Sequence, residues 1–403
     1  MTQTVLVSGA SGFIALHTVK HLLEKGYSVV GSVRSTEKGE NLKKLLGSDK
    51  FSYEIVKDIV EPGAFDDFVK KHPEATVFLH TASPFHFNVT DVKKDLLEPA
   101  VNGTRNALSA VKKFGPQIKR VVVTSSHAAI MTTLNPSEAG PSVVETEETW
   151  NPLTWEGSLE NALVGYCGSK KFAEKAAWDF VEQEKPNFVL STVNPVYVFG
   201  PQAFDALVTD SLNTSAEVIN GVLKAKGSDA EIPKVNAFAV DVRDVADAHI
   251  VAFEKNEAKG KRLLLSAGPF TQQTILDVLH KDFPDKTKAI PAGNPGEDKE
   301  AIKNFLTLDN SWTKSVLGFK LKTVEESIHD TVAQIFKLKG WYIWFRFSFM
   351  VSRDKIVTKF YTCSYFRENP DIEDYRNKEE LVLNMRLDRS SITFCMTNRY
   401  SDV

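Results

Sequence analysis

The sequence predicts an α/β fold built on a doubly wound parallel sheet, followed by a smaller mixed α/β region and an atypical C-terminal extension. Short runs rich in Val, Ile and Phe alternate with longer helix-like segments over about the first 200 residues. A glycine-rich turn directly follows the first of these runs. Strands that alternate with helices are typical of a parallel sheet with helices on both faces.

The expected elements follow one another in a regular order up to about residue 195. The predicted strands are the apolar runs at 4–8, 27–33, 76–80, 119–125 and 188–194. The predicted helices are the segments at 12–25, 91–114 and 166–184. Beyond that point Pro195, Gly200 and Pro201 interrupt the chain, and isolated strand signals occur at 235–240 and 262–266.

The chain is expected to divide into three parts. Residues 1–195 form the sheet domain, and residues 196–340 form a smaller substrate-binding region, from which some segments return to the sheet. Residues 341–403 stand apart, because 13 of these 63 residues are aromatic, against 28 of the first 340, and none is Gly or Ala. This extension is either a tail that docks on a membrane surface or a partner, or an addition outside the fold, such as a gene-model artefact. The second interpretation is favoured.

Composition excludes several classes of protein. The formal charge of −3 and the 42% hydrophobic content give no electrostatic case for binding nucleic acid or an anionic membrane. No apolar stretch is long enough to span a bilayer. Cys167, Cys363 and Cys395 show no spacing typical of a disulfide framework or a zinc site. We therefore expect a soluble, cytoplasmic protein without a metal.

The first turn has the spacing of a phosphate-binding loop. Its residues are Ser8, Gly9, Ala10, Ser11, Gly12, Phe13 and Ile14, in the pattern Gly-x-x-Gly-x-x-Ala that ends at Ala15. Glycine lets the backbone approach a pyrophosphate, and the following helix offers its N–H groups to that anion. The context of strand, turn and helix predicts a dinucleotide site, with a simple tight turn as the alternative.

The second strand identifies the dinucleotide. It ends in Arg34, with Lys38 one helical turn later, and no carboxylate stands at the strand end to bind a ribose 2′-hydroxyl. A 2′-phosphate prefers cations, so the sequence predicts NADPH over NADH. The alternative is that Arg34 and Lys38 are a solvated surface pair.

Two further strand ends carry candidate cofactor contacts. Asp58, followed by Ile59, lies after the third strand and either binds the adenine amino group or is an ordinary turn residue. Thr81 and Ala82 follow the fourth strand, and their small side chains leave room for the nicotinamide ribose.

A third group of residues predicts carbonyl reduction. Tyr166 and Lys170 lie four apart on one face of a helix, and Ser126 follows a strand at the sheet edge where doubly wound folds bind ligands. Reduction needs a hydride at carbon, which NADPH supplies, and a proton at oxygen, which Tyr166 would donate. Lys170 is expected to lower the pKa of Tyr166, and Ser126 to orient the substrate oxygen. Ser125 is less suited, because adjacent strand residues face opposite ways.

These motifs resemble the extended short-chain dehydrogenase/reductase superfamily. The match is close to fungal NADPH-dependent reductases of the methylglyoxal and isovaleraldehyde type, relatives of plant dihydroflavonol and cinnamoyl-CoA reductases. The resemblance covers about residues 1–340 and implies a Rossmann sheet. The segments that carry it are Val7–Ala15, His80–Phe85, Tyr166–Lys175, Asn194–Pro201 and Asp241–Ala246.

The resemblance also implies site roles. Ser126, Tyr166 and Lys170 would be catalytic, and Phe85, His127 and Tyr197, with Ser126 and Tyr166, would line the substrate pocket. The implied cofactor contacts, besides the glycine-rich loop, Tyr166 and Lys170, are Arg34, Lys38, Asp58, Ile59, Thr81, Ala82, Pro195, Val198 and Ser215. Ala15 replaces the third loop glycine, Ala100 replaces the Asn of a catalytic tetrad, and His127 stands where a Tyr is familiar.

The leading function is therefore reduction of small aldehydes and ketones, including 2-oxoaldehydes. The alternatives are a hydroxysteroid or flavonoid-type ketone reductase, a nucleotide-sugar epimerase or dehydratase, and a non-catalytic NADP-binding regulator. His127-Ala128-Ala129 after Ser126 counts against a dehydratase, which usually places acidic residues there. The oligomeric state stays open, with a homodimer among the options.

Overall fold

The computed structural model describes residues 3–83, 89–227, 230, 232 and 234–339, and the backbone of three strands beyond them. Contacts divide the chain into two units, residues 1–335 and 336–403, which are described separately. Phe85, an expected substrate contact, lies outside the described residues. The division at residue 195 and the start of the extension at residue 341 stay predictions.

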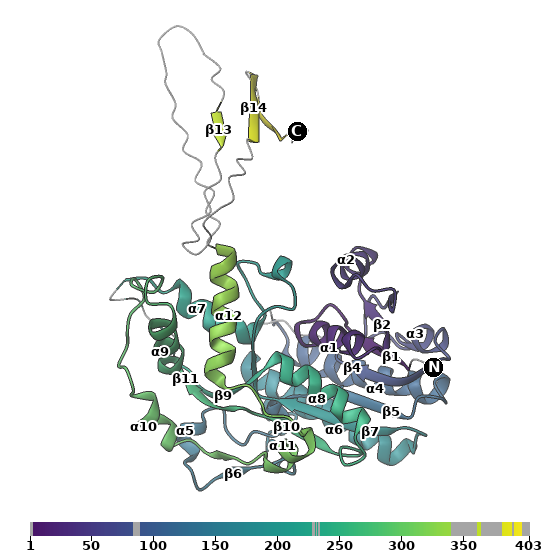
Figure 1. Ribbon diagram of the computed structural model, residues 1–403. Coiled ribbons are helices and arrows are strands. Elements are labelled where there is room, and N and C mark those ends of the chain that lie inside the picture. Colours follow the sequence, from purple (N-terminus) through teal and green to yellow (C-terminus); the bar gives the residue numbers. More distant parts are fainter. Residues whose placement is uncertain are drawn as a thin grey trace, which may run out of the picture. The chain divides into compact units, whose positions relative to one another are not determined.

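A parallel sheet forms the centre of the first unit (Figure 1). Within the described residues it has seven strands in the order β10-β7-β5-β4-β1-β2-β3, and every neighbouring pair is parallel. The predicted doubly wound parallel sheet is thus confirmed. The strands are β1 (Thr4–Ser8), β2 (Ser28–Val33), β3 (Phe51–Ile55), β4 (Ala75–His80), β5 (Arg120–Thr124), β7 (Val189–Pro195) and β10 (Arg262–Leu265).

The sheet is buried on both faces because its strands carry apolar residues at successive positions. In β1, Val5 and Val7 belong to one core cluster and Leu6 belongs to the other. Helices α1 (Phe13–Glu24) and α8 (Val242–Glu254) contribute to the first cluster, which contains Leu16 and Val245. Helices α3 (Asp66–Lys70), α4 (Glu98–Phe114) and α6 (Ala162–Glu184) contribute to the second. Apolar residues at successive positions therefore bring helices to both sides, as a doubly wound sheet requires.

The chain changes direction at the middle of the sheet. From β1 the chain builds outward through β2 to β3 at one edge, and it then returns to β4 beside β1 and continues through β5, β7 and β10 toward the other edge. Such a switch point leaves a crevice at the carboxyl ends of the two central strands, where open α/β sheets bind their ligands.

The first unit contains further strands and helices, of which the last helix runs past residue 335. Strands β8 (Tyr197–Phe199), β9 (Asn236–Asp241) and β11 (Gly268–Thr271) form a mixed sheet, and β6 (Val144–Glu145) pairs with β12 (Thr307–Leu308). The other helices are α2 (Thr36–Leu46), α5 (Pro136–Ala139), α7 (Thr214–Lys224), α9 (Gln272–Asp282), α10 (Asp298–Lys303), α11 (Ser311–Leu317) and α12 (Val324–Lys339).

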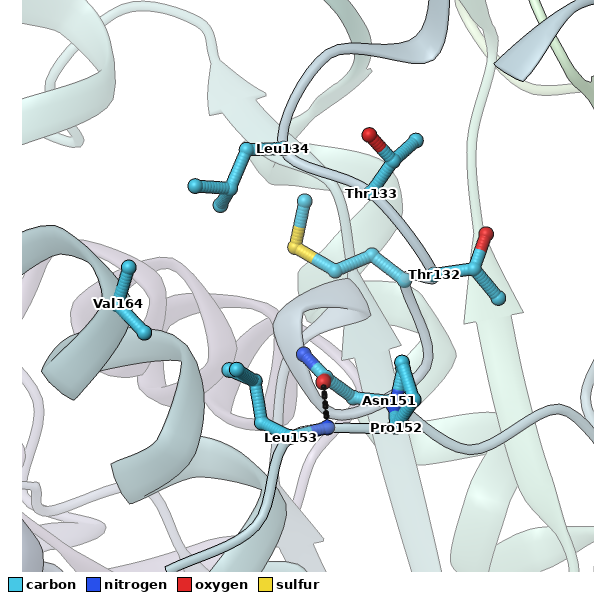
Figure 2. A pocket seen from close by; sticks show the side chains of 8 residues that line it. Thr132, Thr133, Leu134, Asn151, Pro152, Leu153 and Val164 are labelled. Carbon is cyan, nitrogen blue, oxygen red and sulfur yellow. Dashed lines mark hydrogen bonds between the residues drawn. The ribbon is translucent and has the colours of Figure 1, made fainter. Parts of the chain in front are cut away.

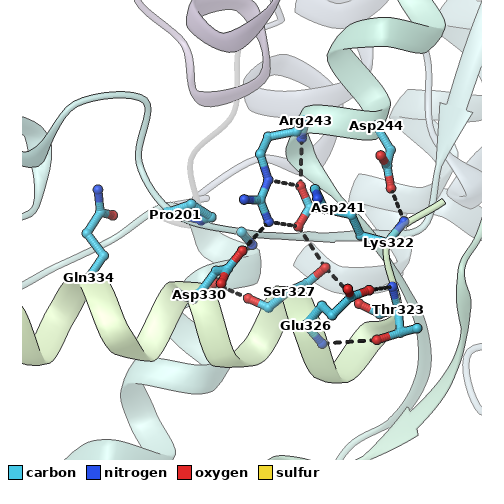
Figure 3. A network of polar contacts seen from close by, with 12 residues as sticks. Pro201, Asp241, Arg243, Asp244, Lys322, Thr323, Glu326, Ser327, Asp330 and Gln334 are labelled. Carbon is cyan, nitrogen blue, oxygen red and sulfur yellow. Dashed lines mark hydrogen bonds and ion pairs between the residues drawn. The ribbon is translucent and has the colours of Figure 1, made fainter. Parts of the chain in front are cut away.

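A polar network fixes α12 against the start of α8 (Figure 3). Asp241 is fully buried, caps α8 by accepting the Arg243 N–H at 2.9 Å, and pairs with the Arg243 guanidinium at 2.7 Å. From α12, Ser327 donates to Asp241 at 2.8 Å, and Asp330 pairs with Arg243 at 2.7 Å. One buried carboxylate thus organises the contact between two helices.

In the second unit, the described backbone forms an antiparallel sheet in the order β13-β14-β15. Its strands are Tyr361–Cys363, Leu381–Asp388 and Ser391–Met396. Across the described part of the chain, none of the helices combines the length and apolar character needed to cross a membrane.

Candidate active site

The glycine-rich turn joins β1 to α1 in a conformation that requires glycine. Gly9 has a φ of +66°, and a Cβ added to it would lie 2.9 Å from the Ala82 Cα. Its N–H donates to the Ser32 hydroxyl at 3.0 Å. The turn therefore packs directly on the chain that leaves β4, with no space for a side chain between them.

The start of α1 is suited to an anion. Gly12 caps the helix in an extended conformation and provides no side-chain hydrogen bond. The first N–H groups of a helix have no partner within the helix and carry partial positive charge. Because no capping side chain takes them at Gly12, the first turn from Phe13 onward presents them at the carboxyl edge of the sheet. This edge fits the pyrophosphate of a dinucleotide.

The hydroxyl of Ser8 forms hydrogen bonds with groups at the end of β4. It is buried, accepts the N–H groups of Thr81 and Ala82 at 3.0 Å each, and lies 2.9 Å from His80 Nδ1. With two donors already bound, the hydroxyl gives its own proton to Nδ1, so the His80 proton is on Nε2. Burial, with a smaller contribution from the nearby Lys170 charge, lowers the pKa of His80 to about 3, which agrees with a neutral ring. Ser8 thus ties the ends of β1 and β4 together.

Two cations follow β2. Arg34 and Lys38 are both exposed, and Ser35 between them caps α2 by accepting the Lys38 N–H at 3.4 Å. Within the described ranges, neither side chain forms an ion pair. Both are therefore accessible to an anion that reaches the strand end, and their role at a 2′-phosphate stays a prediction.

A side chain of α4 holds the backbone of the segment that follows β3. Asp58 is exposed and accepts the Val60 N–H at 2.9 Å, as a turn residue does. Ile59 is buried, and Asn106 of α4 donates to its carbonyl at 3.0 Å and to the two following carbonyls at 2.9 Å each. Asn106 is a positioning group that no sequence motif indicated.

Ser126, Tyr166 and Lys170 come together at the edge of the sheet. Ser126 follows β5 and accepts the Ala128 N–H at 3.1 Å. Its side chain is hydrogen-bonded to Tyr166. The Lys170 ammonium lies 5.6 Å from the centre of the Tyr166 ring and donates to Ser83 at 2.9 Å. The three predicted catalytic side chains are therefore within reach of one small molecule.

Helix α6 begins earlier than expected. Asn161 caps it by accepting the N–H groups of Leu163 and Val164 at 3.0 Å each, so the helix starts at Ala162. Tyr166 lies one turn inside the helix, where its backbone is fixed.

Burial shifts the pKa values of both helix residues. It raises the pKa of Tyr166 to about 12, although the hydrogen bond with Ser126 acts in the opposite direction. It lowers the pKa of Lys170 to about 8. The expected lowering of the Tyr166 pKa by Lys170 is wrong for this structure, because the phenol is desolvated and the ammonium contacts Ser83.

The expected substrate residues lie around this centre. His127 Nε2 is 2.7 Å from Glu145, and its ring packs edge-on to Phe238 at 6.4 Å. Burial of Glu145 is outweighed by hydrogen bonds from His127 and Thr132, which hold its pKa below the usual value. The sequence did not indicate Glu145, which lies in a short acidic run with Glu147 and Glu148 that matches no catalytic motif.

The remaining predicted contacts start from β7 and continue along the chain. Pro195 ends β7, Tyr197 begins β8 and is 39% exposed, and Val198 behind it is buried. Ser215 is half-buried in the first turn of α7. Their roles toward cofactor and substrate stay predictions.

An apolar pocket of about 100 Å³ lies beside α6 (Figure 2). Leu134, Leu153 and Val164 face it, and a hydrogen bond of 2.8 Å from the Leu153 N–H to Asn151 shapes its wall. The Cys167 sulfur, next to Tyr166, lies 3.8 Å from the sulfur of Met131 in this wall. In the described part of the chain, no group of three or more His, Cys, Asp or Glu residues could hold a metal ion.

The comparison with known proteins gives a consistent result. A model of the NAD dependent epimerase/dehydratase family matches residues 5–266. The chain is 59% identical over 339 residues to a putative NADPH-dependent methylglyoxal reductase of Candida albicans, covering 83% of this chain and 98% of that protein. It is 48% identical over 343 residues to the NADPH-dependent methylglyoxal reductase of Saccharomyces cerevisiae, covering 84% and 99%.

Among solved structures, the chain is similar to the crystal structure of yeast methylglyoxal/isovaleraldehyde reductase complexed with NADPH. The TM-score is 0.81 at 47% identity, covering 84% of this chain and 99% of that one. The resemblance expected from the motifs is confirmed.

Proposed function

Because the chain belongs to the NAD dependent epimerase/dehydratase family, we propose that it is an NADPH-dependent reductase of small aldehydes and ketones. Its substrates would be 2-oxoaldehydes such as methylglyoxal and branched aldehydes such as isovaleraldehyde. The relatives described above carry these activities in their names, and they match nearly their whole length to this chain.

The residues at the carboxyl edge of the sheet fit NADPH. Gly9 leaves no side chain between the turn and β4, and the first turn of α1 presents its N–H groups to the pyrophosphate. Arg34 and Lys38 would hold the 2′-phosphate. When bound, the cofactor supplies the hydride.

The observation that carries the proposal is the hydrogen bond between Tyr166 and Ser126, with Lys170 on the same helix face. Ser126 would bind the carbonyl oxygen and hold it against Tyr166 Oη. With its pKa raised to about 12, Tyr166 is protonated at neutral pH, which is the state that a proton donor needs. Lys170 would stabilise the phenolate that remains after the proton has moved to the substrate oxygen.

The carbonyl of a small aldehyde or ketone would bind at Ser126 and Tyr166, the two hydrogen-bonded groups at the edge of the sheet. The sparse cysteines favour a reducing compartment, so we place the protein in the cytoplasm; a homodimer stays a prediction.

The test is NADPH oxidation by the purified full chain with a panel of small aldehydes, ketones and nucleotide sugars. The Tyr166→Phe variant keeps the ring but removes the proton donor. We expect turnover on small carbonyls to fall about 100-fold or more, the range of general acid catalysis, with the dissociation constant for NADPH unchanged. Full turnover by the variant would exclude Tyr166 as the donor, and absence of turnover by the unaltered chain on every carbonyl would reject the proposed function.

A further inference from the structure

A buried carboxylate lies one turn beyond Lys170 on α6. Tyr166, Lys170 and Glu174 follow each other at intervals of four residues, so they share one helix face. Glu174 is 1% exposed. A buried carboxylate is costly unless it is paired and hydrogen-bonded, so its partners indicate what the structure holds in place through it.

Donors from two strands of the central sheet, from the residue after β5 and from α6 itself converge on this carboxylate. Oε1 accepts from Arg262 Nε of β10 at 2.6 Å and from Trp178 Nε1 of α6 at 3.2 Å. Oε2 accepts from the Ser125 hydroxyl and from Asn194 Nδ2 of β7 at 2.6 Å. The carboxylate therefore fixes α6 against the ends of β5, β7 and β10 at once.

The same network holds the backbone of Ser126. Asn194 Nδ2 donates to the Ser126 carbonyl at 3.2 Å, and its Oδ1 accepts from Thr192 at 2.7 Å, which fixes the orientation of the amide. Ser125 is the neighbour of Ser126 and donates to Glu174 from the opposite side of the strand. Glu174 is thus connected to Ser126 both through Asn194 and through the adjacent peptide.

Arg262 extends the network to residues 147–150, a segment between β6 and α6. It donates to the carbonyls of Glu147 at 2.8 Å and Thr149 at 2.6 Å, and its guanidinium lies 4.0 Å from the centre of the Trp150 ring. This segment leads directly to Asn151 in the wall of the apolar pocket. One ion pair therefore connects the helix that carries Tyr166 with the segment that leads to Asn151.

We propose that Glu174 is a positioning residue for carbonyl reduction. Held by Arg262, Ser125 and Asn194, it sets α6 and the end of β5 at the separation that keeps Tyr166 Oη and Ser126 Oγ on one substrate oxygen. The inference rests on the proposed function, since it assigns Glu174 a role in that same site. A misplacement of about 1 Å in such a site costs on the order of 100-fold in rate.

The test combines Glu174→Gln with the milder Ser125→Ala in the full chain. Glutamine keeps the shape but presents an N–H₂ group to donors, and Ser125→Ala removes a single donor. We expect kcat to fall about 10- to 100-fold for Glu174→Gln and about three- to tenfold for Ser125→Ala, with the dissociation constant for NADPH within about twofold of that of the unaltered chain. If Glu174→Gln does not fold, Ser125→Ala carries the test.

Each variant is also made in a Ser126→Ala background. If the network acts by positioning Ser126 against Tyr166, its loss should change kcat by less than about twofold once the Ser126 hydroxyl is gone, because coupled residues are not additive. Equal fold losses in both backgrounds, or a kcat that is unchanged in the original background, would overturn the proposal.

A matched control is Asp241→Asn, which alters another fully buried carboxylate that pairs with an arginine, at the start of α8, and that Ser327 of α12 contacts (Figure 3). It should lower the melting temperature while kcat is retained. If kcat fell as much in this control, the loss in the Glu174 variant would be explained by general destabilisation, and the positioning role would be overturned. Absence of turnover in the unaltered chain would instead reject the proposed function, so the two failures are distinguishable.

Discussion

At the scale of single residues, burial controls the protonation of the site. Desolvation raises the pKa of Tyr166 and lowers that of Lys170, because each group is less stable when charged in a buried position. The structure therefore holds a protonated phenol beside an ammonium with a pKa of about 8. The phenol is therefore protonated at neutral pH, and the ammonium can stabilise negative charge that develops on it during proton transfer.

Arg34 offers a direct test of cofactor choice. Replacing it with Ala should raise the dissociation constant for NADPH about tenfold, because a charge-assisted contact to the 2′-phosphate contributes roughly 1.5–3 kcal/mol, less where it is exposed. The constant for NADH should change by less than about twofold, since NADH has no phosphate at this position. Fluorescence titration with both cofactors measures this.

The control for Arg34 is Lys43→Ala on α2, the helix that follows Arg34, where Lys43 pairs with Glu40 at 3.6 Å and both side chains are exposed. It removes one positive charge from α2 without touching the strand end. Equal losses of affinity for NADPH and NADH in the Arg34 variant would contradict the assignment. If Lys43→Ala weakened NADPH binding as much as the Arg34 substitution does, the loss would reflect the total charge of this region and not a contact of Arg34 with the 2′-phosphate.

The sequence predicted those residues whose chemistry depends on local spacing. Tyr166 and Lys170 are predicted because residues four apart share one face of a helix, and Arg34 because it directly follows the apolar run of β2. Glu174 and Arg262 are not, because their pairing joins positions 88 residues apart, and only the strand order brings them together. The pKa of Tyr166 was assigned the wrong direction for a related reason, since burial is not visible in a motif.

At the scale of elements, the β1–α1 turn combines two demands on one glycine. Gly9 needs a positive φ, which disfavours any side chain, and it also needs contact with Ala82 of the chain leaving β4. The conformational demand could be predicted from the motif. The contact could not, because it depends on the pairing of β1 with β4 across more than 70 residues.

Gly9→Ala should therefore destabilise the fold and weaken NADPH binding together. The positive φ costs roughly 1–2 kcal/mol for a non-glycine residue, and the methyl group must also displace the Ala82 backbone from 2.9 Å. Gly47→Ala is the control, because Gly47 also has a positive φ of +58° but its added Cβ meets nothing within 4 Å.

Urea unfolding and NADPH titration separate the two contributions. Gly47→Ala should cost about 1 kcal/mol and leave the dissociation constant for NADPH unchanged. Gly9→Ala should cost about 1–3 kcal/mol more than its control and raise that constant at least tenfold. Equal costs in the two variants would show that the approach of the turn to β4 is not tight.

At the scale of the whole molecule, the central sheet and its covering helices include elements from beyond residue 195. Strand β10 pairs with β7, and α8 covers the same face as α1. The sequence pattern weakened after residue 195 because these elements are separated by irregular segments, although each has its own apolar run. The order of the strands thus depends on the complete core. The sequence could predict a parallel sheet with helices on both faces, but it could not predict that order.

The complete core also buries three neutral histidines, which should make stability depend on acid. Burial lowers the pKa values of His17, His80 and His249 to about 4, 3 and 4. In the unfolded chain they titrate near 6.5, so below that pH the unfolded state binds more protons and stability falls as the pH falls. Asp244 acts in the opposite direction, because burial raises its pKa to about 6 and the folded state then binds the proton.

Together these four groups take up about two protons on unfolding near pH 5. They should therefore lower the free energy of unfolding by about 2.5 kcal/mol for each unit by which the pH falls between pH 6 and 4.5, in addition to carboxylates such as Glu145 and Asp241, whose pKa values the fold lowers. Urea unfolding at a series of pH values measures this slope. His249→Gln should reduce the proton uptake by about one, which is about 1.4 kcal/mol per pH unit. The reason is that the His249 ring is buried and hydrogen-bonded to Thr124 and to the Val245 carbonyl, each at 2.7 Å. A slope that is flat, or that the substitution leaves unchanged, would mean that these rings are already charged or hydrated in the folded protein.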